Sequence, residues 1–203
     1  MVVDGAVFEA REINAWRGDR HILRDVSFSV RPGEFLKVTG PNGVGKTTLL
    51  RVICGLLPAE TGELWWRGQS VRGRRDEFNF ELGHLGHLNS LKGDLTAREN
   101  LKFLAGLRTT LTAQTIDATL DRVGILSRGD LPARSLSAGQ KRRLALARLL
   151  LADAALWILD EPVTNLDTAG IRLVEELIVD HVERGGLAIA AAHQRLLDDA
   201  PCL

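Results

Sequence analysis

The residues of this sequence that could do chemistry begin at positions 40–48, which read Gly-Pro-Asn-Gly-Val-Gly-Lys-Thr-Thr. Glycines let backbone N–H groups converge on an anion, because they adopt conformations that other residues avoid. In a Gly-x-x-x-x-Gly-Lys-Thr pattern, the lysine reaches the β- and γ-phosphates of a nucleotide and the threonine hydroxyl reaches Mg²⁺. A chance glycine turn is the alternative. We name this segment the phosphate loop and predict that it binds ATP through Gly40, Pro41, Asn42, Gly43, Val44, Gly45, Lys46, Thr47 and Thr48.

A second candidate is the pair Asp160 and Glu161, which follows the apolar run 156–159. A carboxylate at the end of a buried strand is suited to holding Mg²⁺, directly or through water. A carboxylate beside it can polarise an attacking water molecule. We predict the metal role for Asp160, together with Thr47, and the catalytic role for Glu161. Apolar runs that end in two acids are common, so this prediction depends on the phosphate loop.

A third candidate is the segment Leu-Ser-Ala-Gly-Gln at 136–140, which we name the signature segment. Ser137 and Gly139 open a predicted helix, where N–H groups and the helix dipole favour an anion. The alternative is a plain serine cap on an amphipathic helix. Taken alone, the segment favours the cap.

The elements that must position these residues are visible in the hydrophobic pattern. Short apolar strands are predicted directly before the phosphate loop, before Asp160 and before His193, as is typical of buried parallel strands. The predicted strands are residues 26–30, 35–38, 63–66, 155–159 and 187–192. The predicted helices are residues 46–57, 96–107, 112–123, 138–151 and 171–182, and the charged segment 72–76 is predicted to be a surface loop.

The composition excludes several classes of protein. A chain of 203 residues, 45% hydrophobic and 26% charged, suits one soluble domain. Its net charge of zero argues against a nucleic-acid partner, because phosphate backbones require a basic surface. No segment is apolar enough to span a bilayer, and the N-terminus lacks the pattern of a signal peptide. Cys54 and Cys202 lack CxxC spacing, so we expect no disulfide framework.

Together the three motifs, with the signature segment between the phosphate loop and the two acids along the chain, resemble those of the ATPase subunit of an ABC transporter. In that family, two such domains enclose two ATP molecules, and the signature segment of one faces the phosphate loop of the other. The resemblance therefore implies that Ser137 and Gly139 contact the γ-phosphate across a dimer with a second copy of the chain. It also implies a transporter partner in the membrane.

Three further positions follow from the same resemblance. His193 matches the family's switch histidine, which touches the γ-phosphate region, and we count it with Lys46 and Glu161 as catalytic. Asp167 lies in the loop that couples the two active sites. Trp16 is the candidate for stacking on adenine, since a Trp face can stack on a base. Packing of Trp16 on the first sheet is an equally supported alternative.

The chain departs from the family pattern at one position that matters. The family's glutamine, which senses Mg²⁺ and faces the membrane partner, is replaced by the pair His87 and Leu88. His87 could substitute as a polar contact or be an ordinary surface residue. His84 and His87 form a poor metal or haem site, because two ligands without a third are weak evidence.

Within the ABC family, the sequence is most similar to the ATP-binding subunit of the cytochrome c biogenesis haem exporter, the CcmA family. The features that carry this resemblance are Leu156–Pro162, the Gly86-His87 pair and Leu95–Leu101. It implies a peripheral ATP hydrolase on the cytoplasmic face of a bacterial inner membrane, with integral subunits of a haem-handling complex as partners. Two alternatives stay open: a soluble ABC ATPase of the iron–sulfur assembly type, and a module that senses ATP without hydrolysing it.

The predicted fold class is α/β, a P-loop NTPase with a RecA-like core of parallel strands. We expect residues 1–203 to form a single ABC ATPase domain. Its core and an N-terminal antiparallel β part comprise residues 1–86 and 152–203, and a helical lobe comprises residues 87–151.

Overall fold

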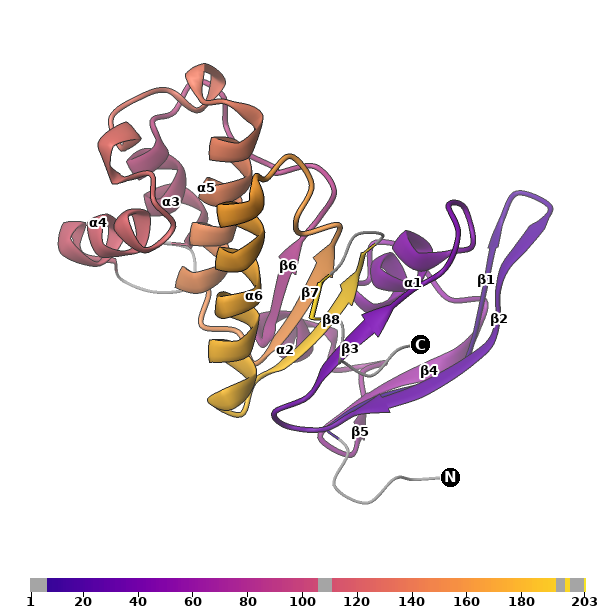
Figure 1. The fold of residues 1–203 in the computed structure, drawn as a ribbon. Helices are drawn as coiled ribbons and strands as arrows, with labels where there is room; N and C mark the ends of the chain where they lie inside the picture. Colours follow the sequence, from indigo (N-terminus) through magenta and orange to yellow (C-terminus); the bar gives the residue numbers. More distant parts are fainter. Residues whose placement is uncertain (1–6, 106–110, 193–195, 198–202) are drawn as a thin grey trace.

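The computed structural model describes residues 7–105, 111–192, 196–197 and 203. In this part of the chain, two four-stranded sheets lie on opposite sides of helix α1, and further helices cover the outer face of one sheet (Figure 1). The antiparallel sheet has the order β2-β1-β4-β5 and consists of β1 (Phe8–Arg17), β2 (Arg20–Val30), β4 (Thr61–Trp66) and β5 (Gln69–Ser70). The parallel sheet has the order β3-β8-β7-β6 and consists of β3 (Phe35–Val38), β6 (Leu82–Leu85), β7 (Leu156–Asp160) and β8 (Leu187–Ala191).

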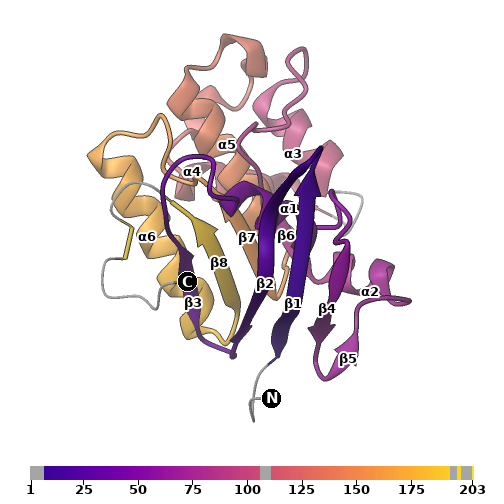
Figure 2. The same cartoon turned by 90° about the vertical axis from the view of Figure 1, so that its right-hand side faces the viewer.

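The helices divide between the two faces of the parallel sheet. Helix α1 packs between the sheets, whereas α3, α4, α5 and α6 lie on the far side from the antiparallel sheet (Figures 1 and 2). The helices are α1 (Lys46–Ile53), α2 (Arg75–Phe80), α3 (Ala97–Ala105), α4 (Ala113–Arg122), α5 (Ala138–Leu151) and α6 (Thr168–Glu183). This arrangement confirms the predicted α/β class, with a parallel core and an antiparallel N-terminal part.

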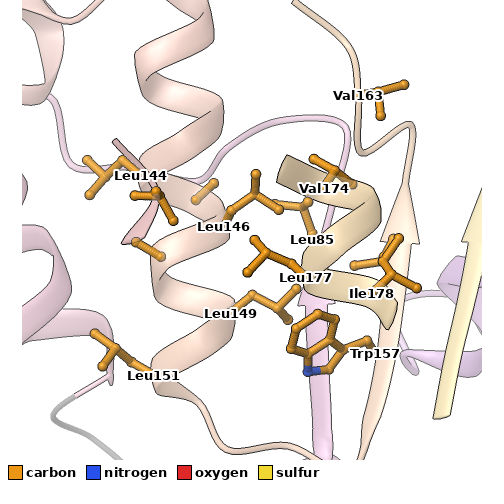
Figure 3. Packing of buried hydrophobic residues seen from close by; sticks show 14 of the residues in the cluster. Leu85, Leu144, Leu146, Leu149, Leu151, Trp157, Val163, Val174, Leu177 and Ile178 are labelled. Atoms are coloured by element: carbon orange, nitrogen blue, oxygen red, sulfur yellow. The ribbon is translucent and has the colours of Figure 1, made fainter. Parts of the chain in front are cut away.

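The parallel strands are mostly apolar because each of their faces packs against a different layer. In β7, Leu156 and Ile158 belong to the core shared with α1 and the antiparallel sheet. Trp157 and Leu159 belong to the core shared with the outer helices. Figure 3 shows Trp157 among leucines of α5 and α6. Such strands cannot shift by one residue without exchanging both faces.

The described residues of the predicted helical lobe 87–151 share a hydrophobic cluster with the neighbouring core. Leu120 of α4 and Leu144 of α5 belong to one cluster with Leu177 of α6 and Leu159 of β7. The division of the domain into a core of residues 1–86 and 152–203 and a helical lobe of residues 87–151 stays a prediction.

Several helix starts follow from their caps. Thr96 and Glu99 form the predicted capping box, since the Glu99 carboxylate accepts from the Thr96 N–H at 2.8 Å and the Thr96 hydroxyl accepts from the Glu99 N–H at 3.1 Å. The start of α6 is fixed by Asp167, whose Oδ1 accepts from the Gly170 N–H at 2.8 Å.

Two local predictions were wrong. Helix α1 ends at Ile53 rather than at residue 57, because Gly55 turns the chain with φ 70°. The charged segment predicted as a loop runs into helix α2, which begins at Arg75. Arg75 is held inward, because its guanidinium donates to the Ile53 carbonyl at 2.7 Å at the end of α1. Phe78 then buries the other side of this short helix.

Within the described residues, no helix combines the length and apolar character needed to cross a membrane.

Candidate nucleotide site

The candidate site forms where three parallel strands end. Val38 of β3 and Asp160 of β7 both pair with Ala191 of β8. Because parallel strands end at the same edge of a sheet, this register places the phosphate loop and the two acids on either side of β8. Ligands in open α/β folds bind at this carboxyl edge.

The phosphate loop closes around the ammonium group of Lys46. This side chain is 7% exposed, and its Nζ donates to the Gly40 and Pro41 carbonyls at 2.8 and 3.2 Å. Gly40, Gly43 and Gly45 have φ values of 134°, 83° and 120°, which non-glycine residues rarely adopt. Helix α1 begins directly after the loop, and its N-cap residue Gly45 provides no side-chain acceptor. The N–H groups of the first turn are therefore suited to phosphate oxygens.

Gly45 also joins the loop to the antiparallel sheet. A Cβ atom at this position would lie 2.9 Å from Cγ2 of Ile22 and 3.0 Å from Cδ2 of Leu23, both in β2. The close approach brings the end of β2, next to the β1–β2 turn, against the nucleotide loop.

We expect Gly45→Ala to lower the free energy of unfolding by roughly 2–3 kcal/mol, because it adds steric overlap to an unfavourable φ. The control is Gly18→Ala in the β1–β2 turn, where φ is 58° and an added Cβ meets no atom within 4 Å. That variant should lose only about 1 kcal/mol. Urea unfolding of both proteins checks this difference, and equal losses would contradict the packing of Gly45 against β2.

The predicted metal ligands are in contact with each other. The Thr47 hydroxyl donates to Oδ1 of Asp160 at 3.1 Å, although the two residues are 113 positions apart. Asp160 is 4% exposed. Hydroxyl and carboxylate oxygens are ligands that Mg²⁺ prefers, and Mg²⁺ usually keeps water or phosphate oxygens for its other positions. The described residues include no cluster of three or more His, Cys, Asp or Glu side chains able to hold a metal alone. The site therefore fits Mg²⁺ delivered with a nucleotide.

Glu161 turns away from the strand that precedes it. Its φ is 51°, in the left-handed region, and its N–H donates to the Ala191 carbonyl at 2.8 Å. The side chain is half-buried. Non-glycine residues in this strained conformation cluster at active sites, which is consistent with a catalytic role for Glu161.

The signature segment begins helix α5 with a complete capping box. The Ser137 hydroxyl accepts from the Gln140 N–H at 3.2 Å, and Oε1 of Gln140 accepts from the Ser137 N–H at 3.0 Å. Gly139 lies against the loop before α6, where an added Cβ would be 2.9 Å from the Asn165 carbonyl oxygen. Ser137 is exposed.

Within one copy, the signature segment and the phosphate loop are apart. In Figure 1, α5 lies in the helical layer on one face of the parallel sheet, whereas α1 lies on the other face, between the two sheets. The structure thus brings together Lys46, Thr47 and Asp160, and it leaves Ser137 and Gly139 at another surface.

Trp16 lies beside a histidine that the sequence pattern did not single out. Its ring stacks on His21, the cross-strand neighbour, with centroids 4.4 Å apart and planes 2° from parallel. Nε2 of His21 is 2.8 Å from Oδ1 of Asn14. Trp16 is 48% exposed, so much of its surface is open to a ligand. The sequence would point to His21 only if the register of β1 and β2 were known, because this register pairs His21 with Trp16.

The remaining predicted residues are placed as follows. His193 lies outside the described residues. Asp167 serves as the N-cap of α6 and lies 3.4 Å from the Arg143 guanidinium. His87 and Leu88 are exposed, Leu88 at 78%. His84 is half-buried in β6, and burial lowers its pKa below the usual value.

The sequence analysis also missed Arg142 and Asn89, which contact each other near the site. Arg142 is 2% exposed, and it hydrogen-bonds the Oδ1 of Asn89 at 3.1 Å. A basic run at 141–143 gives no sign that its middle residue is buried, apart from its helical spacing to the apolar residues of α5.

Comparison with solved structures and protein families agrees with this geometry. The pattern of the ABC transporter family matches residues 23–164, which include the phosphate loop, the signature segment and the two acids. CbiO1 from Clostridium perfringens, part of the ABC transporter complex cbiONQ, has the same fold with a TM-score of 0.78 and 27% identity, over 94% of this chain and 80% of that one. Fold and site together define the class, an ATP-binding subunit of the ABC transporter type.

More similar relatives narrow the class. The cytochrome c biogenesis ATP-binding export protein CcmA 2 of Cupriavidus metallidurans is 46% identical over 192 residues, which are 94% of this chain and 91% of that protein. The corresponding CcmA protein of Nitrosococcus oceani is 48% identical over 182 residues, which are 89% of this chain and 82% of that protein. The chain belongs to the CcmA family of ABC transporter ATP-binding proteins.

Proposed function

We propose that this chain is the ATP-hydrolysing subunit of the haem-handling export complex of cytochrome c biogenesis. Support comes from its relatives, which are named as cytochrome c biogenesis ATP-binding export proteins. Its partners are integral subunits of that complex, and it is a peripheral protein on the cytoplasmic face of the inner membrane. Leu88, 78% exposed in the segment where the family resemblance implies contact with a membrane subunit, is a candidate contact.

The observation that carries the hydrolytic function is the contact between Thr47 and Asp160 beside Lys46. Lys46 and the first turn of α1 bind the β- and γ-phosphates. Thr47 and Asp160 hold Mg²⁺, which when bound neutralises charge on the phosphates. Glu161 accepts a proton from the attacking water. His193, after β8, is proposed to contact the γ-phosphate.

The second half of the site comes from another copy of the chain. Helix α5, which the signature segment begins, and helix α1, which follows the phosphate loop, lie on opposite faces of the parallel sheet, and this separation supports a role for Ser137 and Gly139 at a partner's nucleotide (Figure 1). The exposed Ser137 and the N-terminus of the 14-residue helix α5 offer hydroxyl and N–H donors to the γ-phosphate. ATP binding closes this dimer, and hydrolysis reopens it.

Trp16 supports the adenine base in this proposal. Because β2 contacts the phosphate loop through Gly45, the exposed Trp16 lies on the strand pair that leads to the nucleotide. We expect Trp16→Ala to raise the KM for ATP at least about 5-fold with little change in kcat, since stacking on a base is worth roughly 1–3 kcal/mol. Steady-state kinetics with Trp65→Ala, a change in the same sheet, provides the control. An unchanged KM in Trp16→Ala would show that the base binds elsewhere.

The decisive experiment identifies the membrane partner. The full chain, affinity-purified from detergent-solubilised membranes, should bring down multi-helix integral proteins, and the purified complex should hydrolyse ATP. Recovery of a soluble scaffold protein instead would favour the iron–sulfur assembly alternative. A complex that binds ATP without turnover would favour the ATP-sensing alternative.

A further inference from the structure

The side chain of Arg142 joins three parts of the molecule that the nucleotide site needs. It extends from α5, five residues after the start of the signature helix at Ser137, and it is 2% exposed. Its guanidinium donates to the Gly86 carbonyl at 2.8 Å and to Oδ1 of Asn89 at 3.1 Å. It also donates to the carbonyl oxygens of residues 160–162, at 2.9, 2.8 and 3.0 Å.

These five hydrogen bonds use every N–H group of the guanidinium. All five acceptors are uncharged oxygen atoms, so no ion pair explains the burial of the charge. Burial lowers the pKa of Arg142 to about 10, while the nearby Asp160 and Glu161 carboxylates act to raise it. The group is therefore charged at neutral pH. A buried charge is costly unless it is fully hydrogen-bonded, and this set of acceptors meets that condition.

The acceptors show what Arg142 fixes. Three of them belong to the turn at 160–162, which gives Glu161 its left-handed conformation with φ 51°. The other two belong to the segment that follows β6, where the family's glutamine is missing and Asn89 supplies a side-chain amide. Arg142 itself belongs to α5, the helix that the signature segment begins. The planar guanidinium of Arg142 thus links three features. They are helix α5, whose start is proposed to face a second copy, the turn at 160–162 and the segment 86–89, which includes the exposed Leu88.

We propose that Arg142 is a positioning residue for ATP hydrolysis, which holds the Glu161 turn and the segment 86–89 in register with the signature helix. The inference rests on the proposed function, because it takes Glu161 as the catalytic base. Because all five N–H groups of its guanidinium bind protein oxygen atoms, Arg142 acts through the backbone at 160–162.

The first test is kinetic, on the full chain in its purified membrane complex. Arg142→Gln should lower kcat at least about 10-fold and change the KM for ATP by less than about 3-fold, because misplacing a catalytic group costs rate rather than binding. Arg142→Lys should not rescue kcat, since an ammonium has three donors and cannot span the five acceptors. The matched control is Arg148→Gln in the same helix, whose side chain donates to the His84 and Ser90 carbonyls only at 3.3 and 3.5 Å. It should keep kcat within about 2-fold.

The second test does not depend on turnover. In hydrogen exchange on the nucleotide-free chain, Arg142→Gln should speed exchange of the amides of Glu161, Val163 and Thr164 about 10-fold, and Arg148→Gln should leave them unchanged. Wild-type kcat in Arg142→Gln, full rescue by Arg142→Lys, or equal exchange in both variants would overturn the inference. Failure of the proposed function would give a different result, namely wild-type turnover in Glu161→Gln. If Glu161→Gln loses turnover but Arg142→Gln has normal kinetics, only the role of Arg142 is rejected.

Discussion

Replacing Lys46 with alanine should abolish tight ATP binding. The Lys46 ammonium is the buried cation around which the phosphate loop closes, with two loop carbonyls as acceptors at 2.8 and 3.2 Å. Removing it leaves those carbonyls without their donor and the phosphates without a positive charge. Charge-assisted hydrogen bonds are worth roughly 1.5–3 kcal/mol each, so ATP should bind at least about 100-fold more weakly and turnover should be lost.

Titration with a fluorescent ATP analogue measures the effect directly. Lys92→Ala provides the control, because Lys92 is exposed and its ammonium lies over the Phe103 ring, 4.6 Å from the centroid. That variant should bind ATP like the wild type. Wild-type affinity in Lys46→Ala would show that the phosphates bind outside the loop.

The second large effect is expected from Glu161→Gln, which should lower kcat by roughly 100- to 1,000-fold, the usual size of a general-base contribution. The substitution keeps the shape of the side chain and both backbone contacts of residue 161, its N–H to the Ala191 carbonyl and its carbonyl to Arg142. ATP affinity should therefore be retained.

Single-turnover hydrolysis by the purified complex separates these quantities. Glu176→Gln on the exposed side of α6 is the matched control and should hydrolyse ATP normally. Wild-type turnover in Glu161→Gln would remove Glu161 from the mechanism.

The fold could be predicted where one strong physical signal was present. The continuous apolar run before Asp160 predicted a buried strand within one residue at each end, and α5 was predicted at its observed bounds, Ala138–Leu151. Strand β6 was missed because Gly83 and His84 weaken its pattern. Gly83 is needed at that point, since an added Cβ would lie 2.7 Å from Cδ1 of Leu149 in α5. That requirement appears only when helix and strand are packed together.

Some residues of the candidate site could likewise be predicted from the sequence, and others could not. Lys46, Thr47 and Asp160 could be predicted because their motifs are local, and the structure brings them together. The role of Arg142 could not, because its acceptors at 86–89 and 160–162 are far from it in sequence. The stacking of His21 on Trp16 likewise depends on strand register rather than on a motif. Motifs thus identify the candidate ligand-binding groups, whereas the residues that contact those groups from distant parts of the sequence are identified only in the tertiary structure.

The central claim is that the phosphate loop of one copy is completed by the signature segment of another. The most direct measurement is the mass of the Glu161→Gln chain in solution, by light scattering, with and without ATP and Mg²⁺. We predict the single-chain mass of 22.2 kDa without nucleotide and twice that mass at saturating ATP. Adding Ser137→Arg, which blocks the exposed start of α5, should return the ATP-bound protein to 22.2 kDa. A Glu161→Gln chain that binds ATP and keeps the single-chain mass, or a dimer unaffected by Ser137→Arg, would contradict the shared site.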